Sequence, residues 1–593
     1  MNRRTDIHAV DDVGQAVAAW LARFNEAVAD PRPERLGALF LPDSHWREVL
    51  ALSWQLITLS GREEIGRALA QALPRFQARN FAIDPRRCAP RVVERAGVNV
   101  VEAILRFDTV IGSGAALVRM RLDADPGAAP MAWTLHTTLE EIRGHEEETL
   151  RARREEPVFA RDFHGPNWLD KRQAAARYAD REPTVLVVGG GHAGLSAAAR
   201  LGQLNIDTLV VDRMRRIGDN WRLRYRGLKL HNQVHSNHLP YMPYPPTWQA
   251  YLPKDRIANW LEMYADCMDI NFWTQTSFEG ATFDADSGRW EAGLELADGG
   301  TRTVRPRHII MATSVSGTPM IPKIPTLERF AGKVMHSSEF GDGAPWRGRS
   351  VLILGTGTSA HDIAQDLHGN GARATLVQRS PTLVVQVEPS AQLYDGIYLG
   401  DGPSLEDRDL INTSIPKKLM LATHKLLTDK AKEHDRPMRE ALEKVGFRLS
   451  DGVDGTGWPY LFRTRGGGYY FNVGCSNLIA SGEVGLVQHD DIDTFTADGL
   501  SMKDGRKLQA DLVLLATGFM GHDYMVRTMF GPDVAAKVGP IWGYDPRTQE
   551  LRNMWMRTGQ PGLWFTGGPF SSCRAYSKYL ALQIKALELG LVE

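Results

Sequence analysis

Hydrophobic spacing divides the 593-residue chain into two parts of different character. Within residues 1–150, apolar residues recur every three or four positions from Val13 to Ala27, which is typical of an amphipathic helix. A shorter helical pattern covers Gly61–Leu73. Alternating segments then predict strands at Arg91–Phe107, Ala115–Leu122 and Met131–Ile142. Helices followed by a meander of strands indicate a small α+β domain.

A highly charged segment containing EEETLRARREE follows this domain. We interpret residues 151–182 as a linker with helical pieces whose charges face solvent.

From Pro183 the pattern changes to short apolar runs of the buried parallel type, beginning with the strand Thr184–Val188. A strand–turn–helix–strand plan starts there and recurs at Ser350–Arg379. We therefore expect an α/β fold with two Rossmann-like domains, the second inserted in the first. The expected boundaries are 183–335 for the first part, 336–510 for the insertion, and 511–593 for the return and the C-terminal segment.

The first strand runs into a complete G-x-G-x-x-G turn, Gly189–Gly194, which opens a helix. Gly189 allows the tight turn, Gly191 removes a Cβ where a pyrophosphate approaches, and Gly194 lets the helix pack closely on the strand. Helix N–H groups then face the phosphate. Asp212, 21 residues after Gly191, ends the second strand, where an acid can bind a ribose 2′-OH.

The second turn has Gly355, Gly357 and Ser359, with Ala360 in the position of the last glycine. Where the first copy has its acid, this copy has Arg379 and Ser380. An arginine pairs with a 2′-phosphate through charge-assisted hydrogen bonds, so we assign this turn to NADPH and the first to FAD. A surface arginine beside an NADH site is the alternative. Hydride transfer between two such cofactors also fits a simple reductase.

Composition narrows the class of protein. The net charge is −1, so no basic field points to nucleic acid. The N-terminus has no apolar signal core, and no apolar run approaches the roughly 20 residues of a membrane helix, so we expect a cytoplasmic protein. The four cysteines are far apart and form no CxxC pair, which argues against a disulfide-redox site, and no metal-binding motif occurs.

Five features between Pro183 and Glu593 resemble the flavin-containing monooxygenases of flavoprotein class B. They are the two glycine turns, the latter with its Arg379; the segment IGDNWRLRYRGLKLH at Ile217–His231; the F-x-G-x-x-x-H-x-x-x-F string at Phe330–Phe340; and LLATGF at Leu514–Phe519. The LKLH and LPYMPYP segments look most like indole-3-pyruvate monooxygenases. The N-terminal pattern resembles the NTF2-like or SnoaL-like cone fold.

The resemblance implies that NADPH reduces FAD and that a C4a-(hydro)peroxyflavin transfers one oxygen atom of dioxygen to a small organic substrate. It favours N- or S-oxygenation. Oxidative decarboxylation of a 2-oxo acid such as indole-3-pyruvate, Baeyer–Villiger oxidation of a ketone, and a reductase without oxygen insertion stay open, as does a homodimer.

The same resemblance supplies further site residues. Trp221 and His231 match flavin-contacting positions, and Thr517 and Gly518 match cofactor-binding positions. Asn237 and His336 are the catalytic candidates, although a structural bridge between the nucleotide domains is the favoured interpretation of His336. The alternative for Asn237 is a loop residue whose side chain forms hydrogen bonds with the backbone of its own loop.

Overall fold

The structure is a computed structural model that describes residues 8–121, 129–147, 149, 164–314 and 317–592. Most of the first half of the expected linker, and Leu122 at the end of one expected strand, lie outside these residues. Within the rest, Trp168–Arg177 forms helix α4, in agreement with helical pieces in that segment.

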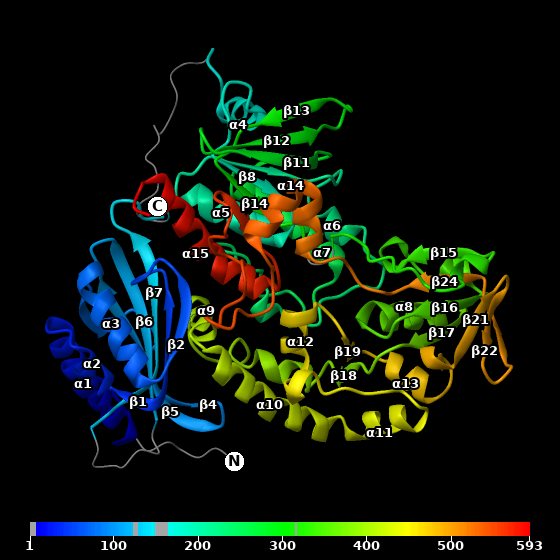
Figure 1. Ribbon diagram of the computed structural model, residues 1–593, viewed down its shortest axis with the longest axis horizontal. Coiled ribbons are helices and arrows are strands. Elements are labelled where there is room, and N and C mark those ends of the chain that lie inside the picture. Colours follow the sequence, from blue (N-terminus) through cyan, green and yellow to red (C-terminus); the bar gives the residue numbers. More distant parts are fainter. Residues whose placement is uncertain (1–7, 122–128, 148, 150–163, 315–316, 593) are drawn as a thin grey trace.

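The N-terminal domain is a mixed seven-stranded sheet covered on one face by three helices (Figure 1). Its path is β2-β1-β7-β6-β5-β3, with β4 also paired to β5; β1 and β7 run parallel and the other pairs are antiparallel. The elements are α1 His8–Ala29, α2 Pro33–Gly37, β1 Phe40–Val49, β2 Leu56–Ser60, α3 Arg62–Phe76, β3 Arg79–Ile83, β4 Arg91–Arg95, β5 Val98–Asp108, β6 Gly112–Arg121 and β7 Ala132–Ile142.

The predicted helices and the later strands of this domain are present, whereas β1, β2 and β3 were not predicted. From Ser44 to Val49 strand β1 is buried on both faces, so it lacks the alternation that identifies a half-buried strand. The helix-facing side of the sheet is filled by side chains, among them the stacked pairs Trp20–Phe24 and Phe81–Phe107, each with ring centroids 4.7 Å apart.

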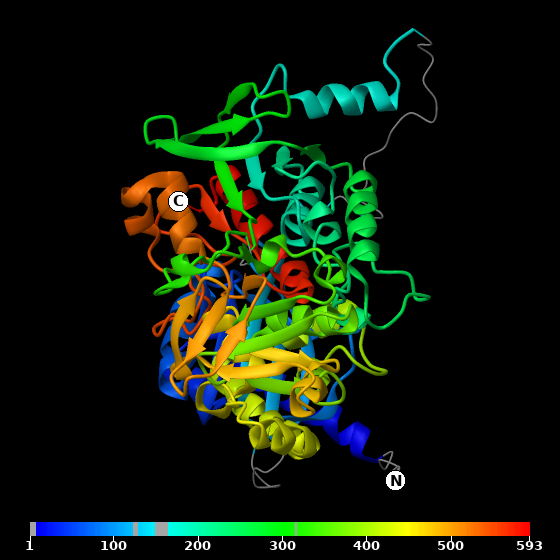
Figure 2. The same ribbon diagram turned by 90° about the vertical axis from the view of Figure 1, so that its right-hand side faces the viewer.

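The first α/β unit is a five-stranded parallel sheet in the order β10-β9-β8-β14-β25. Helices α5 and α15 pack together against this sheet. A separate three-stranded antiparallel sheet, β11–β13, lies beyond it at the top of Figure 2. The elements are β8 Val185–Val188, α5 His192–Gln203, β9 Thr208–Val211, α6 Asp219–Arg222, α7 Lys254–Cys267, β10 Asn271–Trp273, β11 Ser277–Asp284, β12 Arg289–Glu295, β13 Thr301–Val304, β14 His308–Met311, α14 His522–Val538, β25 Leu563–Phe565 and α15 Phe570–Glu588.

The second unit is a parallel sheet in the order β15-β24-β16-β17-β20. Its strands and helix are β15 Lys333–His336, β16 Ser350–Leu354, α8 Thr358–Gly369, β17 Arg373–Gln378, β20 Gly485–Gln488 and β24 Leu512–Leu515. Around them lie β18 Leu383–Gln386, α9 Leu405–Thr413, α10 Lys417–His434, α11 Arg436–Lys444, α12 Gly457–Arg465, β19 Tyr469–Asn472, α13 Cys475–Ala480, β21 Ile492–Thr496, β22 Gly499–Met502 and β23 Lys507–Gln509.

Two expected boundaries differ from the strand pairing. We placed the return to the first unit at residue 511, but β24 pairs with β15 and β16 of the second sheet. The chain therefore rejoins the first sheet only through α14 and β25. Strand β15, assigned to the first part up to residue 335, also belongs to the second sheet. Strand β24 is a short buried run and β15 is a short edge strand with two exposed residues, and neither pattern indicates which of two similar sheets the strand joins.

The outer face of the N-terminal sheet packs on the rest of the chain, which contains the two α/β units. Ile104 and Leu117 of this face meet Leu410 and Ile411 of α9. Arg47 of β1 forms a two-pronged ion pair with Glu550, with nitrogen–oxygen distances of 2.6 and 2.8 Å, and both side chains are buried. The N-terminal domain is thus fixed to the body of the protein by apolar contact and a buried pair.

Glu48 gives a test of the N-terminal core. Its carboxyl is fully buried, accepts hydrogen bonds from the Leu52 N–H and the Thr137 hydroxyl, and burial raises its pKa to about 7. This pKa lies above that of Glu48 in the unfolded chain. The contribution of Glu48 to the free energy of unfolding is therefore fully present below about pH 4.5 and is lost as the pH rises through 7. For Glu48→Gln, the free energy of unfolding relative to the native chain should rise between these pH values and then level off. Urea unfolding from pH 4.5 to 8 measures the difference, and parallel curves would contradict it.

Candidate functional site

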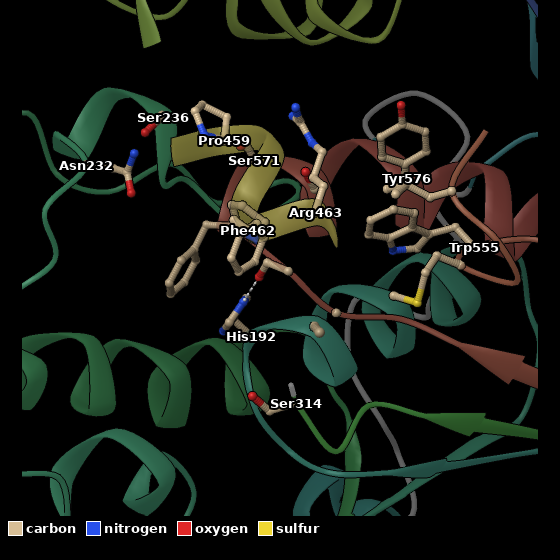
Figure 3. A pocket seen from close by; sticks show the side chains of 18 of the residues that line it. His192, Asn232, Ser236, Ser314, Pro459, Phe462, Arg463, Trp555, Ser571 and Tyr576 are labelled. Carbon is tan, nitrogen blue, oxygen red and sulfur yellow. Dashed lines mark hydrogen bonds between the residues drawn. The ribbon is translucent and has the colours of Figure 1, made fainter. Parts of the chain in front are cut away.

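A cavity of about 1170 Å³ runs between the three parts of the chain. It exceeds the 300–1,000 Å³ usual for a site that holds one small ligand. Side chains and turns from every part line it, including Arg47 and Arg119 from the N-terminal sheet, Gly189, Asp212, Trp221, His231 and Asn237 from the first unit, Phe471 from β19, and Trp555, Phe570 and Tyr576 near the C-terminus. Figure 3 shows part of this wall.

The first glycine turn opens directly into the cavity. Gly189 has a φ of +107°, and a Cβ there would lie 2.6 Å from the Ala312 carbonyl oxygen. A Cβ on Gly194 would lie 2.0 Å from the Gly189 oxygen, so this glycine is needed for the close packing of α5. At Gly191 a Cβ would approach the Asn220 amide to 2.8 Å, and no side chain caps α5. The turn thus leaves a cradle of backbone N–H groups that fits a pyrophosphate.

Asp212 lies at the end of β9, beside this turn. One carboxylate oxygen accepts the Gly190 N–H at 2.7 Å, and the other accepts the Met214 N–H at 2.9 Å. The side chain also lines the cavity. Asp212 therefore holds the turn in place, and its remaining lone pairs can accept hydrogen bonds from a ribose.

Trp221 and His231 face the same cavity. Trp221 lies 6.1 Å from the His192 ring and 5.9 Å from the Phe570 ring, measured between centroids. His192, which the motif places only on the turn, stacks on Phe570 at 4.1 Å and donates from Nε2 to the Gly568 carbonyl. Burial lowers the pKa of His231 to about 4, so this imidazole is neutral at physiological pH.

The second glycine turn does not line the cavity. Gly355 has a φ of +128°, and a Cβ there would lie 2.5 Å from the Ala516 carbonyl oxygen. Gly357 precedes α8 without a side-chain cap, and Ser359 lies in the first turn of that helix. Arg379 and Ser380 follow β17 and are exposed. The turn is half-buried to buried, whereas the arginine and the serine that follow β17 are exposed to solvent.

Thr517 and Gly518 lie between the two units and outside the cavity lining. The Thr517 hydroxyl donates to the Met320 carbonyl at 2.6 Å, and the Gly518 carbonyl accepts from the Met320 N–H and from Nε2 of His336. The residues that follow them, Phe519–His522, do line the cavity. Of the predicted segment, only its last residue, Phe519, reaches the cavity, together with the three residues that follow it, and the cofactor role of Thr517 and Gly518 stays a prediction.

His336 is buried and fully engaged. Its Nδ1 accepts the Ser338 N–H at 3.1 Å, which leaves Nε2 to donate to the Gly518 carbonyl at 3.0 Å. Burial lowers the pKa of this imidazole. The side chain joins the end of β15 to the segment after β24, and His336 is not among the cavity residues. This geometry fits a structural bridge between these two segments and leaves the imidazole no free nitrogen for proton transfer.

Asn237 lies at the cavity wall, where its amide nitrogen donates to the carbonyls of Asn232 and Gln233. The backbone on both sides of it is held by one guanidinium: Nη1 of Arg574 donates to the Ser236 carbonyl at 2.9 Å and to the His238 carbonyl at 2.7 Å. Arg574 comes from α15, which lies more than three hundred residues further along the chain.

Asp409 of α9 fixes that guanidinium in turn. Its two oxygens accept from Nε and Nη2 of Arg574 at 2.7 and 2.6 Å, and the Tyr398 hydroxyl donates to Asp409 at 2.8 Å. Arg574 is 3% exposed. Because α9 also packs on the N-terminal sheet, the segment carrying Asn237 is positioned by three parts of the protein.

Sequence patterns missed much of the remaining wall. It comes from residues 393–398, from α10 and α12, and from 544–555, none of which carries a motif. The aromatic residues Trp458, Tyr469 and Phe471 are in the wall, whereas Tyr470, which belongs to the same aromatic run, is fully buried elsewhere. Only that aromatic clustering could have pointed to this side of the site.

Comparison with known proteins agrees with this arrangement. The family model of pyridine nucleotide-disulphide oxidoreductases matches residues 183–394. Indole-3-pyruvate monooxygenase YUCCA1 of Oryza sativa subsp. japonica is 29% identical over 60% of this chain and 81% of that protein. Probable indole-3-pyruvate monooxygenase YUCCA9 of Arabidopsis thaliana is 30% identical over 57% of this chain and 75% of that protein.

The chain belongs to the flavin-containing monooxygenase family. Solved structures agree on the fold. A cyclohexanone monooxygenase mutant from Rhodococcus sp. Phi1 bound to NADP⁺ aligns with a TM-score of 0.51 and 17% identity, over 69% of this chain and 86% of that one. OTEMO in complex with FAD and NADP gives 0.50 and 18%, with the same coverage. In the part of the chain that the structure describes, no helix has the length and apolar character to cross a membrane.

The Arg574–Asp409 pair can be tested by removing one partner. Arg574→Met leaves a largely buried carboxylate without its cation, so the free energy of unfolding should fall by about 3–5 kcal/mol. The double variant with Asp409→Leu should recover part of this loss, since no unpaired charge remains. Denaturant unfolding measures both.

The matched control is Arg216→Met, which breaks a two-pronged pair with Glu262 on the surface. There the loss should be much smaller, because solvent screens an exposed pair. Equal losses at the two sites would contradict the importance of the buried pair.

Proposed function

We propose that the protein is an FAD- and NADPH-dependent monooxygenase that inserts one oxygen atom of dioxygen into a small organic substrate, by N- or S-oxygenation. The main support for this proposal is that one cavity is lined by the Gly189–Gly194 turn, by Asn237 and by the aromatic residues Trp458, Tyr469 and Phe471. Family membership supports the use of oxygen. Flavin reduced by the nicotinamide cofactor supplies the activated oxygen when both are bound.

The residues divide the task between binding and shielding. The backbone cradle of Gly189, Gly191 and Gly194 with Asp212 would hold FAD, and Gly355, Gly357, Ser359 and Arg379 with Ser380 would hold NADPH. Trp221 and Phe570 would exclude water from the reacting end. The side-chain oxygen of Asn237 would accept a hydrogen bond there, since its amide nitrogen already donates to two backbone carbonyls, and Arg574 fixes its position.

A disulfide reductase is a poorer fit, although the matching family model includes disulphide oxidoreductases. The four cysteines are all free, and Cys573, on the C-terminal helix near the cavity, is completely buried. Burial raises the pKa of its thiol, which disfavours the reactive thiolate. Electron transfer to a cysteine pair has no structural basis among the described residues.

Oxidative decarboxylation of a 2-oxo acid is the second candidate, because the named relatives are indole-3-pyruvate monooxygenases. For the N-terminal domain we propose an NTF2-like fold whose cone interior is filled by side chains, so that it acts as a scaffold and not as a second active site.

Labelled dioxygen tests the main proposal. Purified holoenzyme with NADPH, ¹⁸O₂ and a panel of amines, sulfides and 2-oxo acids should give at least one product that carries a single ¹⁸O atom, detected by mass spectrometry. A panel in which all reducing equivalents appear as hydrogen peroxide, with no labelled product, would contradict oxygen insertion.

The nicotinamide assignment rests on Arg379. Arg379→Ala removes charge-assisted hydrogen bonds to a 2′-phosphate, so KM for NADPH should rise about 10- to 100-fold while KM for NADH changes little. Arg373→Ala, an exposed arginine at the other end of the same strand, is the control and should leave both constants unchanged. Equal effects of Arg379→Ala on both cofactors would refute the NADPH preference.

A further inference from the structure

One end of the cavity carries positive charge that the proposed cofactor sites do not use. Arg463 of α12 and Lys417 of α10 both line it, and both lie outside the stretch matched by the family model. Figure 3 shows Arg463 between Phe462 and Tyr576. Each side chain is only partly exposed, so the two cations have lost part of their hydration.

Neither cation forms an ion pair with a described carboxylate. Across the described residues, no Asp or Glu oxygen lies within 4.0 Å of the Arg463 guanidinium or the Lys417 ammonium. Arg463 contacts the thioether sulfur of Met420 at 2.9 Å, and Lys417 lies 4.6 Å above the ring of Tyr544. Burial and the charge of Arg552 lower the pKa of Lys417, which is the effect of excess positive charge nearby.

The acids in this part of the wall are engaged elsewhere. Both oxygens of Glu550 accept from Arg47, and one also accepts from the Thr58 hydroxyl. Asp395 accepts from the side-chain amide of Asn232; burial raises the pKa of its carboxyl, and the charge of Arg463 opposes part of that rise. The wall therefore offers a ligand donors and positive charge that no described carboxylate within ion-pair distance neutralises.

We propose that this end of the cavity binds the carboxylate of the substrate, with Arg463 as the principal anchor and Lys417 beside it. A guanidinium matches a carboxylate through two parallel hydrogen bonds. The neighbouring side chains Phe462, Trp555 and Tyr576 are aromatic, and Trp555 stacks on Tyr576 at 4.7 Å. The substrate class is thus an aromatic or apolar acid that presents its oxidisable atom toward His192 and Phe570.

This assignment rests on the proposed function, because the cavity is taken as the monooxygenase site. A phosphate of the nicotinamide cofactor would be recognised by the same chemistry. The substrate is favoured because the second glycine turn and Arg379 lie outside this cavity.

A pair of probes that differ only in charge tests the proposal. The probes are 4-(methylthio)benzoate and 4-(methylthio)benzamide, which carry the same sulfide. Their dissociation constants for the FAD-loaded protein are measured without oxygen, by the change in flavin absorbance or by thermal shift. Native protein should prefer the acid about tenfold or more. Arg463→Gln should weaken binding of the acid about 10- to 100-fold and that of the amide less than threefold.

Arg465→Gln, an exposed arginine two residues further along α12, is the matched control and should leave both constants unchanged. Arg463→Lys keeps the charge without the two-pronged geometry and should fall between native protein and Arg463→Gln. It also replaces Arg463→Gln if that variant fails to retain flavin.

Three outcomes would overturn the assignment. They are equal affinity of native protein for acid and amide, equal weakening of both by Arg463→Gln, and a rise in KM for NADPH with no change for the acid, which would assign the anion to the nucleotide. Failure of the proposed function looks different: selective binding of the acid without ¹⁸O in any product would leave the carboxylate site intact and remove oxygen insertion.

Discussion

The ion pair between Arg574 and Asp409 is the contact on which the candidate site depends. It joins the C-terminal helix to α9, and the same guanidinium holds the carbonyls on either side of Asn237. A charge buried in this way is costly unless every lone pair and proton has a partner. Here the Tyr398 hydroxyl and the two carbonyls complete the network, so the pair fixes the point where the short 3₁₀ helix Val234–Ser236 ends.

The N-terminal domain takes part in this arrangement through α9. On the side facing the N-terminal sheet, Asp407 of α9 accepts from Arg87 and from the Cys88 N–H, and Arg119 donates to the Ser414 hydroxyl. On its other side the same helix carries Asp409. The position of the Asn237 segment is therefore set by a domain that the matched relatives need not share, since they align with only about three fifths of this chain.

The two glycine turns could be predicted because their geometry is local: a positive φ or a close backbone approach at Gly189 and Gly355 demands glycine whatever surrounds it. Strand β1 could not, because burial on both faces removes its alternation. The sheet to which β24 belongs depends on pairing between segments far apart. The wall formed by α10 and the position of Arg463 on α12 were missed for the same reason, since Arg463 has no motif and reaches the cavity only in the folded chain.

The adjacency of β15 and β24 has a mechanical consequence. The chain passes into the second unit through β15 and leaves it through β24, and these strands are hydrogen-bonded neighbours. The His336–Gly518 hydrogen bond ties them at the point of crossing. Both covalent connections of the second unit therefore cross at one edge of its sheet, and the His336 imidazole couples the entry of the chain into that unit to its exit.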